Sequence, residues 1–257
     1  MLRRQWLIAR TIFVEALRRR EIYAIVLITA GMLLLASLLR FFDLQGLHKF
    51  YHEVSLKVMT TATVLTVIVL AARQLPREFE RRTIYTLLAK PIARWEFLLG
   101  KYVGVVLAGL FCLGLFMGVF CLGRLFTQAP LDWRLFGQFL FMQGLAIGCL
   151  AALSFLLSML MGLDAAIVTA MLIYLLGQVM TNAMTVVYEF TGAAGRAVLI
   201  TLNYLVPQPA LFDLSAKVVH EWPPVPAWVL GLATLYCLMF VIPYLGLSYA
   251  LFRRRAL

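Results

Sequence analysis

One cluster in the sequence has the residue types and the spacing of a metal site. His48, His52 and Glu53 form an H-x-x-x-H-E pattern, and on a helix both imidazoles would share a face, as zinc ligands can. A structural zinc site is usually four-coordinate, and no third or fourth ligand is evident nearby. We therefore interpret this stretch as part of a solvated loop and predict no metal ion in the chain.

The stretch LLGKY, which contains Lys101, has some features of a phosphate-binding loop. That loop needs a glycine five residues before Gly100 and a serine or threonine directly after the lysine. Trp95 and Tyr102 occupy those positions instead, and no catalytic set is evident elsewhere. We predict that the chain is not an enzyme, that it holds no cofactor, and that any ATP chemistry belongs to a partner.

The composition indicates the kind of fold that positions these residues. Hydrophobic residues make up 63% of the 257 residues and charged residues 14%, whereas soluble domains are about 45–50% apolar and 25% charged. The chain is therefore predicted to be an all-α polytopic membrane protein with one domain, residues 1–257. The formal net charge of +11 does not indicate nucleic-acid binding, because in a membrane protein the positions of the basic residues matter more than their sum. The four cysteines lie in apolar runs without CxxC spacing and are expected to be small buried hydrophobes: Cys112, Cys121, Cys149 and Cys237.

Six apolar segments have about the 18–20 residues that a membrane-spanning helix needs. They lie at 22–39, 54–72, 102–123, 135–163, 165–188 and 227–252. With the N-terminus inside, sixteen of the 23 Lys and Arg residues fall on the inner side and seven on the outer side. The positive-inside rule therefore predicts that both termini are cytoplasmic.

Polar residues occur within several of these segments. The fifth segment contains Gln178, Thr181, Asn182 and Thr185, and Gln178 and Asn182 share one helical face. Such residues either hydrogen-bond between helices or line a dimer seam or a water-filled path. No charged residue lies in the middle of a segment, which argues against a proton pump or a channel with a charged filter. Three small-x-x-x-small patterns predict close helix packing: Gly100 with Gly104, Gly114 with Gly118, and Gly144 with Gly148 and Ala152.

Two further regions flank the predicted spans. Residues 1–20 are predicted to form an amphipathic helix with arginines at both ends, which is typical of a helix parallel to the membrane. Residues 189–226 are rich in proline and predict either short interfacial helices at the outer surface or a simple covering loop.

The region 76–100, between the second and third spans, is basic and partly amphipathic. A helix could begin at Pro76, and Ile84, Leu87 and Leu88 form an apolar stripe that ends at Pro91. A second short element is expected over 94–99. The helix would lie either on anionic lipid or in a groove of a cytoplasmic partner. Glu78 and Glu80 favour the partner, because acidic side chains gain nothing from an anionic surface.

These stretches resemble the permease subunit of ABC-2 type exporters, especially the NosY-like branch. ARTIFVEALRRR (9–20) resembles its elbow helix, REFERRTIYTLLAKPIARWEFLLGKYVG (77–104) its coupling-helix region, and LNYLVPQPALFDLSAKVVH (202–220) the stretch before its last span. The middle stretch departs from the pattern at Ala93, where serine is usual. Its matching residues are Glu78, Glu80, Thr83, Leu87, Leu88, Pro91, Arg94, Gly100 and Lys101.

The resemblance implies a function as well as a fold. Two permeases, in a homodimer or a heterodimer, would each bind one cytoplasmic ATPase that holds ATP and Mg²⁺, and would move a substrate outward across a bacterial inner membrane. The alternative is a membrane scaffold or assembly protein without transport. No residue distinguishes a lipid, peptide, sugar or drug as the substrate. The residues implied to couple to the ATPase are Glu78, Glu80, Arg81, Arg82, Thr83, Ile84, Leu87, Leu88, Pro91 and Arg94.

Overall fold

The computed structural model describes residues 47–80, 93–127, 131–190 and 207–255, together with isolated residues at 10, 11, 14, 23, 27, 30, 31, 192, 195 and 196. Over these residues the chain is helical and contains no strand. The expected elbow helix, the first span and residues 81–92 of the coupling region lie outside them, apart from the isolated residues.

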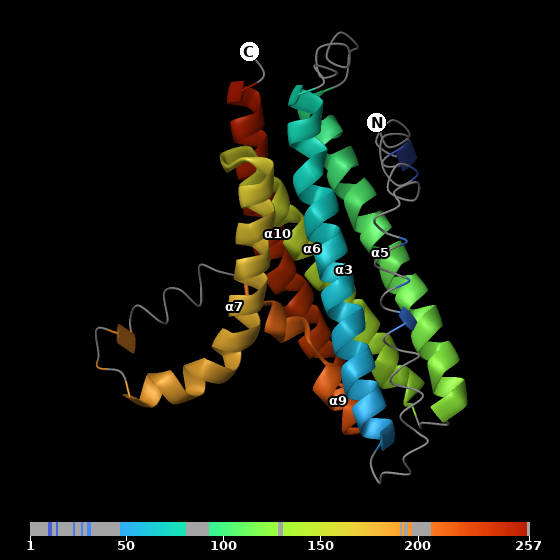
Figure 1. The fold of residues 1–257 in the computed structure, drawn as a ribbon. Coiled ribbons are helices and arrows are strands. Elements are labelled where there is room, and N and C mark those ends of the chain that lie inside the picture. The colour runs from blue at the N-terminus through green and yellow to red at the C-terminus, as the bar shows by residue number, and fades with distance from the viewer. Residues whose placement is uncertain are drawn as a thin grey trace.

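Five long helices and two short ones make up the described part of the chain (Figure 1). The long helices are α3 (Leu47–Glu80), α5 (Arg94–Thr127), α6 (Trp133–Leu160), α7 (Leu163–Phe190) and α10 (Ala227–Arg255). The short ones are η2 (Pro209–Phe212) and α9 (Ser215–Val219).

Four of the long helices are long and apolar enough to cross a membrane. These candidate spans are His52–Pro76, Arg94–Arg124, Trp133–Leu160 and Ala227–Arg254, and they confirm the second, third, fourth and sixth predicted segments. Within the residues searched, α7 contributes a shorter apolar stretch, Leu163–Gln178. The total of six spans therefore stays a prediction.

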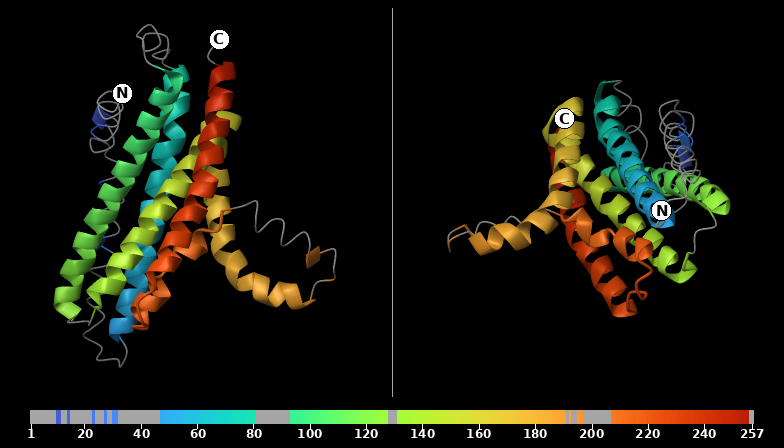
Figure 2. Two further views of the ribbon diagram at one scale, coloured as in Figure 1. Left: turned by 180° about the vertical axis from the view of Figure 1, so that it is seen from behind. Right: turned by 60° about the horizontal axis from the view of Figure 1, so that its bottom comes forward.

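The helix α6 is the centre of the bundle. It packs against α10, α3, α7 and α5, and Figure 2 shows it between α3 and α10. It is also the most buried of the four candidate spans, whereas α10 is the least buried. Aromatic side chains fill one end of this core, where Phe136 stacks on Phe120 and Phe139.

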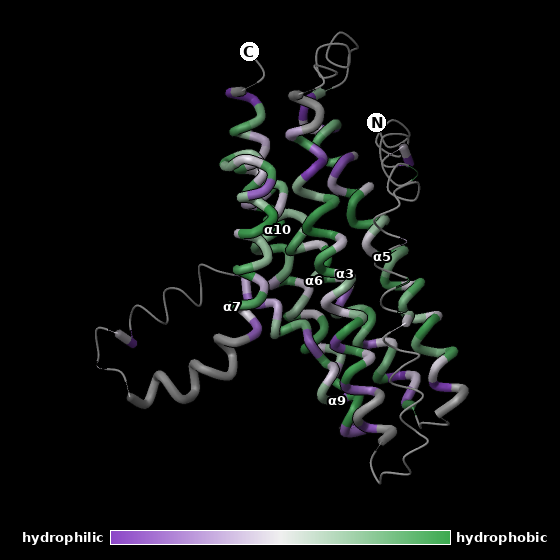
Figure 3. Tube along the Cα trace, viewed as in Figure 1, coloured by the Kyte–Doolittle hydropathy of each residue, from purple (hydrophilic) through white to green (hydrophobic). Residues whose placement is uncertain are grey.

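The helix ends separate into two groups along the bundle axis. The end of α3, the beginning of α5 and the end of α10 lie at the upper end in Figure 1, and α9 lies with the beginnings of α3 and α10 at the lower end. Hydrophobic residues predominate along the middle of the helices, as Figure 3 shows. This alternation of the helix ends is the one expected from the predicted topology.

Local chemistry explains where several helices begin and end. Asp132 caps α6, because its side chain accepts a hydrogen bond of 2.8 Å from the backbone amide of Arg134. After α9 the backbone of Glu221 has a positive φ of 53°. The amide of Trp222 then donates to the carbonyl of Lys217 at 3.0 Å, as in a Schellman cap.

The chain before α10 is tied to α6 by a reciprocal pair of hydrogen bonds. The side-chain amide of Gln138 donates to the carbonyl of Val225, and the amide of Val225 donates to the Gln138 side chain, each at 2.8 Å. The pair fixes the entry to α10 against the lower part of α6.

Two local expectations around the coupling region are corrected. No helix begins at Pro76, because α3 continues through it to Glu80. The expected short element at 94–99 is not separate, since α5 runs without a break from Arg94 into the third span. At the start of α5 the carbonyl of Ala93 accepts the amide of Phe97 at 3.2 Å.

Close packing at glycine occurs at a position that the small-residue patterns missed. A Cβ atom on Gly109 would lie 2.5 Å from Val67 Cγ2 and 2.9 Å from Ile147 Cγ2. A Cβ atom on Gly114 or Gly118 would meet no described atom within 4 Å. Of Gly109, Gly114 and Gly118 on α5, Gly109 is therefore the one that packs closely against α3 and α6.

Candidate functional site

A polar cavity of about 260 Å³ lies at the lower end of the bundle. It is formed between α3, α7 and the segment 207–220, which carries η2 and α9. Its lining residues are Glu53, Lys57, Gln178, Ala210, Asp213, Ser215, Ala216, Val219 and His220. Charged, amide and imidazole groups thus line one cavity in an otherwise apolar bundle.

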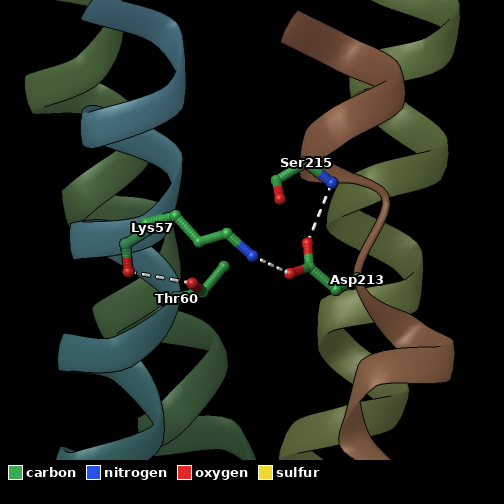
Figure 4. Close-up of polar contacts among 4 residues, drawn as sticks. All are labelled: Lys57, Thr60, Asp213 and Ser215. Carbon is green, nitrogen blue, oxygen red and sulfur yellow. Dashed lines mark hydrogen bonds and ion pairs between the residues drawn. The ribbon is translucent and has the colours of Figure 1, made fainter. Parts of the chain in front are cut away.

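An ion pair between Lys57 and Asp213 crosses this cavity (Figure 4). Asp213 also accepts the backbone amide of Ser215 at 2.9 Å. Burial alone would raise the pKa of the Asp213 carboxyl, but the hydrogen bonds from Lys57 and Ser215 outweigh it and hold that pKa below its usual value. The Lys57 side chain is 52% exposed and that of Asp213 is 12% exposed, so the pair links a partly buried carboxylate to a lysine that reaches solvent.

The segment that carries Asp213 is held in place by contacts on both sides. Phe212 is 1% exposed, and its ring lies 6.0 Å from the ring of Tyr236 on α10. The Tyr236 hydroxyl accepts the backbone amide of Gln208 at 3.1 Å. On the α7 side, Pro209 lies so close to Gly177 that a Cβ atom there would be 2.5 Å from the proline Cδ. Glycine at 177 is therefore what lets η2 sit directly on α7.

The polar face of α7 reaches the cavity at Gln178. This side chain is half-buried and lines the cavity wall. The Tyr174 hydroxyl, one turn earlier, lies close to the Gln178 amide and to the hydroxyls of Thr60 and Thr61 on α3. The other predicted path residues follow on the backbone of α7, and their side chains lie outside the described residues: Thr181, Asn182 and Thr185.

Three hydroxyls on α3 and α6 bond within their own helices, unlike the Tyr102 hydroxyl of α5, which donates to the carbonyl of Gly148 on α6 at 3.1 Å. Thr63 donates to the carbonyl of Met59 and Thr66 to that of Ala62, both at 2.8 Å and both within α3. Ser154 donates to the carbonyl of Leu150 within α6. Each of these three hydroxyls is satisfied by the preceding turn of its own helix, so it needs no partner across the bundle.

The histidine pair does not lie in a solvated loop, and this expectation is wrong. His48 and His52 belong to α3, and His52 is 1% exposed, with its ring 5.6 Å from that of Phe120. Among the described residues, no group of three or more His, Cys, Asp or Glu side chains could hold a metal ion. The described His52 side chain is thus part of the aromatic core.

The predicted coupling residues are described only at the two borders of the region. Glu78 and Glu80 lie on the last turn of α3, where the structure describes the backbone. Arg94 is the first residue of α5, and its guanidinium donates to the carbonyl of Arg253 on α10 at 3.2 Å. Residues Arg81, Arg82, Thr83, Ile84, Leu87, Leu88 and Pro91 lie outside the described part.

Sequence reasoning missed three residues that shape these sites. No role in a site was predicted for Lys57, Asp213 or Gly177. The pattern P-A-L-F-D-L-S, in which Asp213 precedes Ser215 by two residues, is typical of an Asx turn and is a signal that identifies a fixed carboxylate. Its partner on α3, 156 residues earlier in the chain, has no such local signal.

A comparison with protein families matches nearly the whole chain. A family model described as "ABC-2 family transporter protein" matches residues 11–257. No curated protein shows a significant match to the sequence.

Proposed function

Because the chain belongs to the ABC-2 family of transporter proteins, we propose that it is the permease subunit of an exporter that moves its substrate outward using ATP hydrolysed by a partner. The match over residues 11–257 is the observation that carries this proposal. In this family the membrane component is non-catalytic and associates with an ATP-binding subunit. ATP and Mg²⁺ would accordingly be held by that partner.

The upper end of the bundle is the surface on which we place the ATPase. α3 and α5 contact each other, and the segment 81–92 joins their upper ends. Arg94, Arg253 and Arg254 lie at the same end. A basic end favours a cytoplasmic location, since Lys and Arg are concentrated on that side of membrane proteins. Both termini would then be cytoplasmic, and the protein would lie in a bacterial inner membrane.

The polar cavity at the lower end supports an outward path. Gln178 and the Lys57–Asp213 pair place amide and charged groups beside an apolar bundle, and such groups are costly in lipid unless they face protein or water. We propose that this face of α7, continued by Thr181, Asn182 and Thr185, lines the path or the seam with a second permease copy.

The experiment that tests the proposal measures assembly with the ATPase. The chain is co-expressed with its ATPase partner, and the amount of ATPase that co-purifies is measured for Glu78→Lys/Glu80→Lys and for Leu87→Asp. Both variants are expected to lose the complex, because reversing close interfacial charges typically costs several kcal/mol and Leu87→Asp would bury a charge. Glu53→Lys/Glu221→Lys is the matched control, since both of these glutamates are exposed at the opposite end.

Each outcome separates the docking segment from a helix that merely lies on lipid. If the region only contacts anionic lipid, the added lysines tighten binding to anionic vesicles and leave the complex intact. An undiminished complex in both variants would overturn the assignment of this segment. A wild-type chain that binds no ATPase at all would overturn the transporter function itself.

A further inference from the structure

Lys101 is buried at the upper end of the bundle, in the second turn of α5. Lys101 is only 3% exposed, and its ammonium group donates to the backbone carbonyl of Gln74 on α3 at 2.9 Å. Gln74 is itself 6% exposed. The bond therefore joins the buried faces of α3 and α5 close to the segment 81–92.

The same turns of α5 are also attached to α10. The Lys101 ammonium lies 5.0 Å from the centre of the Phe97 ring, and that ring stacks on Phe252 of α10 with centroids 6.1 Å apart. One turn earlier, Arg94 donates to the carbonyl of Arg253. The beginning of α5 thus contacts the upper parts of both α3 and α10.

The Gln74 carbonyl, to which Lys101 donates, lies next to a position where α3 can bend. Pro76 lies inside α3, two residues after Gln74. A proline lacks the amide that would bond to the carbonyl four residues earlier, and its ring pushes that carbonyl away, so helices bend readily there. A bond from another helix at Gln74 limits this freedom.

A buried ammonium is an unusual way to stabilise a contact. Moving the charge out of water is costly, and replacing a buried charge by an apolar side chain of similar size is often neutral or stabilising. A methionine at 101 would fill similar space without that cost. What the lysine adds is a directional bond that fixes α3 relative to α5.

From these contacts we infer that Lys101 is a positioning residue, which holds the upper ends of α3 and α5 in a fixed relation and so fixes both ends of the segment 81–92. The inference rests on the proposed function, because it is this segment that the ATPase would move. A displacement of the beginning of α5 then passes into α3 through Gln74 and into α10 through Phe97 and Arg94. Without the Lys101 bond the last turns of α3 move about Pro76 independently of α5.

The first test measures distances in the full chain, in lipid nanodiscs and without the ATPase. Spin labels are attached to cysteines at Arg77 on α3 and Trp95 on α5, in a chain whose four native cysteines are replaced by alanine. Lys101→Met is expected to widen the distance distribution of this pair, and Lys101→Arg, which keeps a cationic donor, to keep it narrow. A second label pair, at Glu53 and Leu122, spans the same two helices at the lower end and is expected to stay unchanged.

The second test measures the ATPase rate of the assembled complex. Lys101→Met is expected to keep the complex and lower its rate by about 2- to 30-fold, the range for residues that alter coupling without contacting either ligand. Lys49→Met is the matched control, because it removes an exposed lysine at the opposite end of α3 that does not line the cavity. If the wild-type chain binds no ATPase, the proposed function fails, while the distance measurement still tests the Lys101 contact.

Two results would overturn the inference. One is an unchanged distance distribution between positions 77 and 95 in Lys101→Met. The other is a wild-type ATPase rate in an assembled Lys101→Met complex. If Lys101→Met does not insert stably, Lys101→Leu removes the ammonium with a different apolar side chain. The same widening is then expected, and an unchanged distribution in Lys101→Leu would overturn the inference equally.

Discussion

The substitution Gly109→Ala tests how closely α5 is packed. Its Cβ atom would lie 2.5 Å from Val67 Cγ2 and 2.9 Å from Ile147 Cγ2, whereas ordinary contacts are 3.4–4 Å. Val67 is 0% exposed and Ile147 1% exposed, and β-branched side chains in a helix have one preferred rotamer, so neither can turn away freely. Overpacking of this kind costs about 1–3 kcal/mol of unfolding free energy.

Gly114→Ala on the same helix is the matched control, because its Cβ atom meets no described atom within 4 Å. Both variants gain the same helix propensity, about 1 kcal/mol for alanine over glycine. The difference between them therefore isolates the packing cost. At about 2–4 °C per kcal/mol for a chain of this size, Gly109→Ala should melt about 2–12 °C below Gly114→Ala.

The assay is thermal unfolding of the purified chain in detergent, followed by the reaction of a thiol-specific fluorophore with the buried free cysteines Cys112 and Cys149. Adding Val67→Ala removes the methyl group that the new Cβ atom meets, so the double variant should lose less stability than the two single losses together. Equal melting temperatures for Gly109→Ala and Gly114→Ala would refute the described contact between α5 and α3. So would strictly additive losses in the double variant.

Three further predictions concern the polar cavity. The pKa of Asp213 is lowered in the folded chain, so its charged form stabilises the fold at neutral pH. This contribution to the unfolding free energy is lost as the pH falls below about 4. Unfolding measured against pH should show this loss in the wild type and not in Asp213→Asn. Lys57→Met should lower the unfolding free energy by less than about 1 kcal/mol, because the lysine is half exposed and screened by solvent, and a larger loss at neutral pH would contradict this account of the pair. A cysteine at Gln178 should react with a membrane-impermeant thiol reagent faster than one at Leu172, an exposed apolar residue of the same helix. Gly177→Ala should speed the reaction at position 178 further by displacing Pro209. Equal rates at positions 178 and 172 would leave packing as the role of Gln178.

The positions of four spans could be predicted from the sequence, because long apolar runs must be helical in a membrane. The ends of the helices could not. Pro76 was expected to begin a helix, yet the preceding residues from Ala72 to Leu75 include no turn residue, and proline is tolerated within membrane helices when neighbouring groups satisfy the backbone. The continuation of α5 back to Arg94 was missed because the charged residues within 94–99 were interpreted as part of a separate short element.

The contacts between helices were less predictable than the helices themselves. Gly114 and Gly118 have the spacing of a packing motif but meet no described neighbour, whereas Gly109, outside any such motif, packs closely against α3 and α6. His52 was read as exposed because it is polar, although its ring packs on Phe120. The Lys57–Asp213 pair depends on where a distant segment returns to the bundle. None of these contacts follows from local spacing, because spacing fixes the face of a helix and not its neighbour.

The reciprocal hydrogen bonds between Gln138 and Val225 have a consequence for biosynthesis. The two residues are 87 positions apart, and a membrane protein is made from its N-terminus onward. When α6 leaves the ribosome, the amide of Gln138 has no partner, and the face of α6 that α10 will cover is still open to lipid. The bundle is completed only when the last helix inserts. A chain that stops before residue 225 would therefore present both an unsatisfied amide and an uncovered central helix.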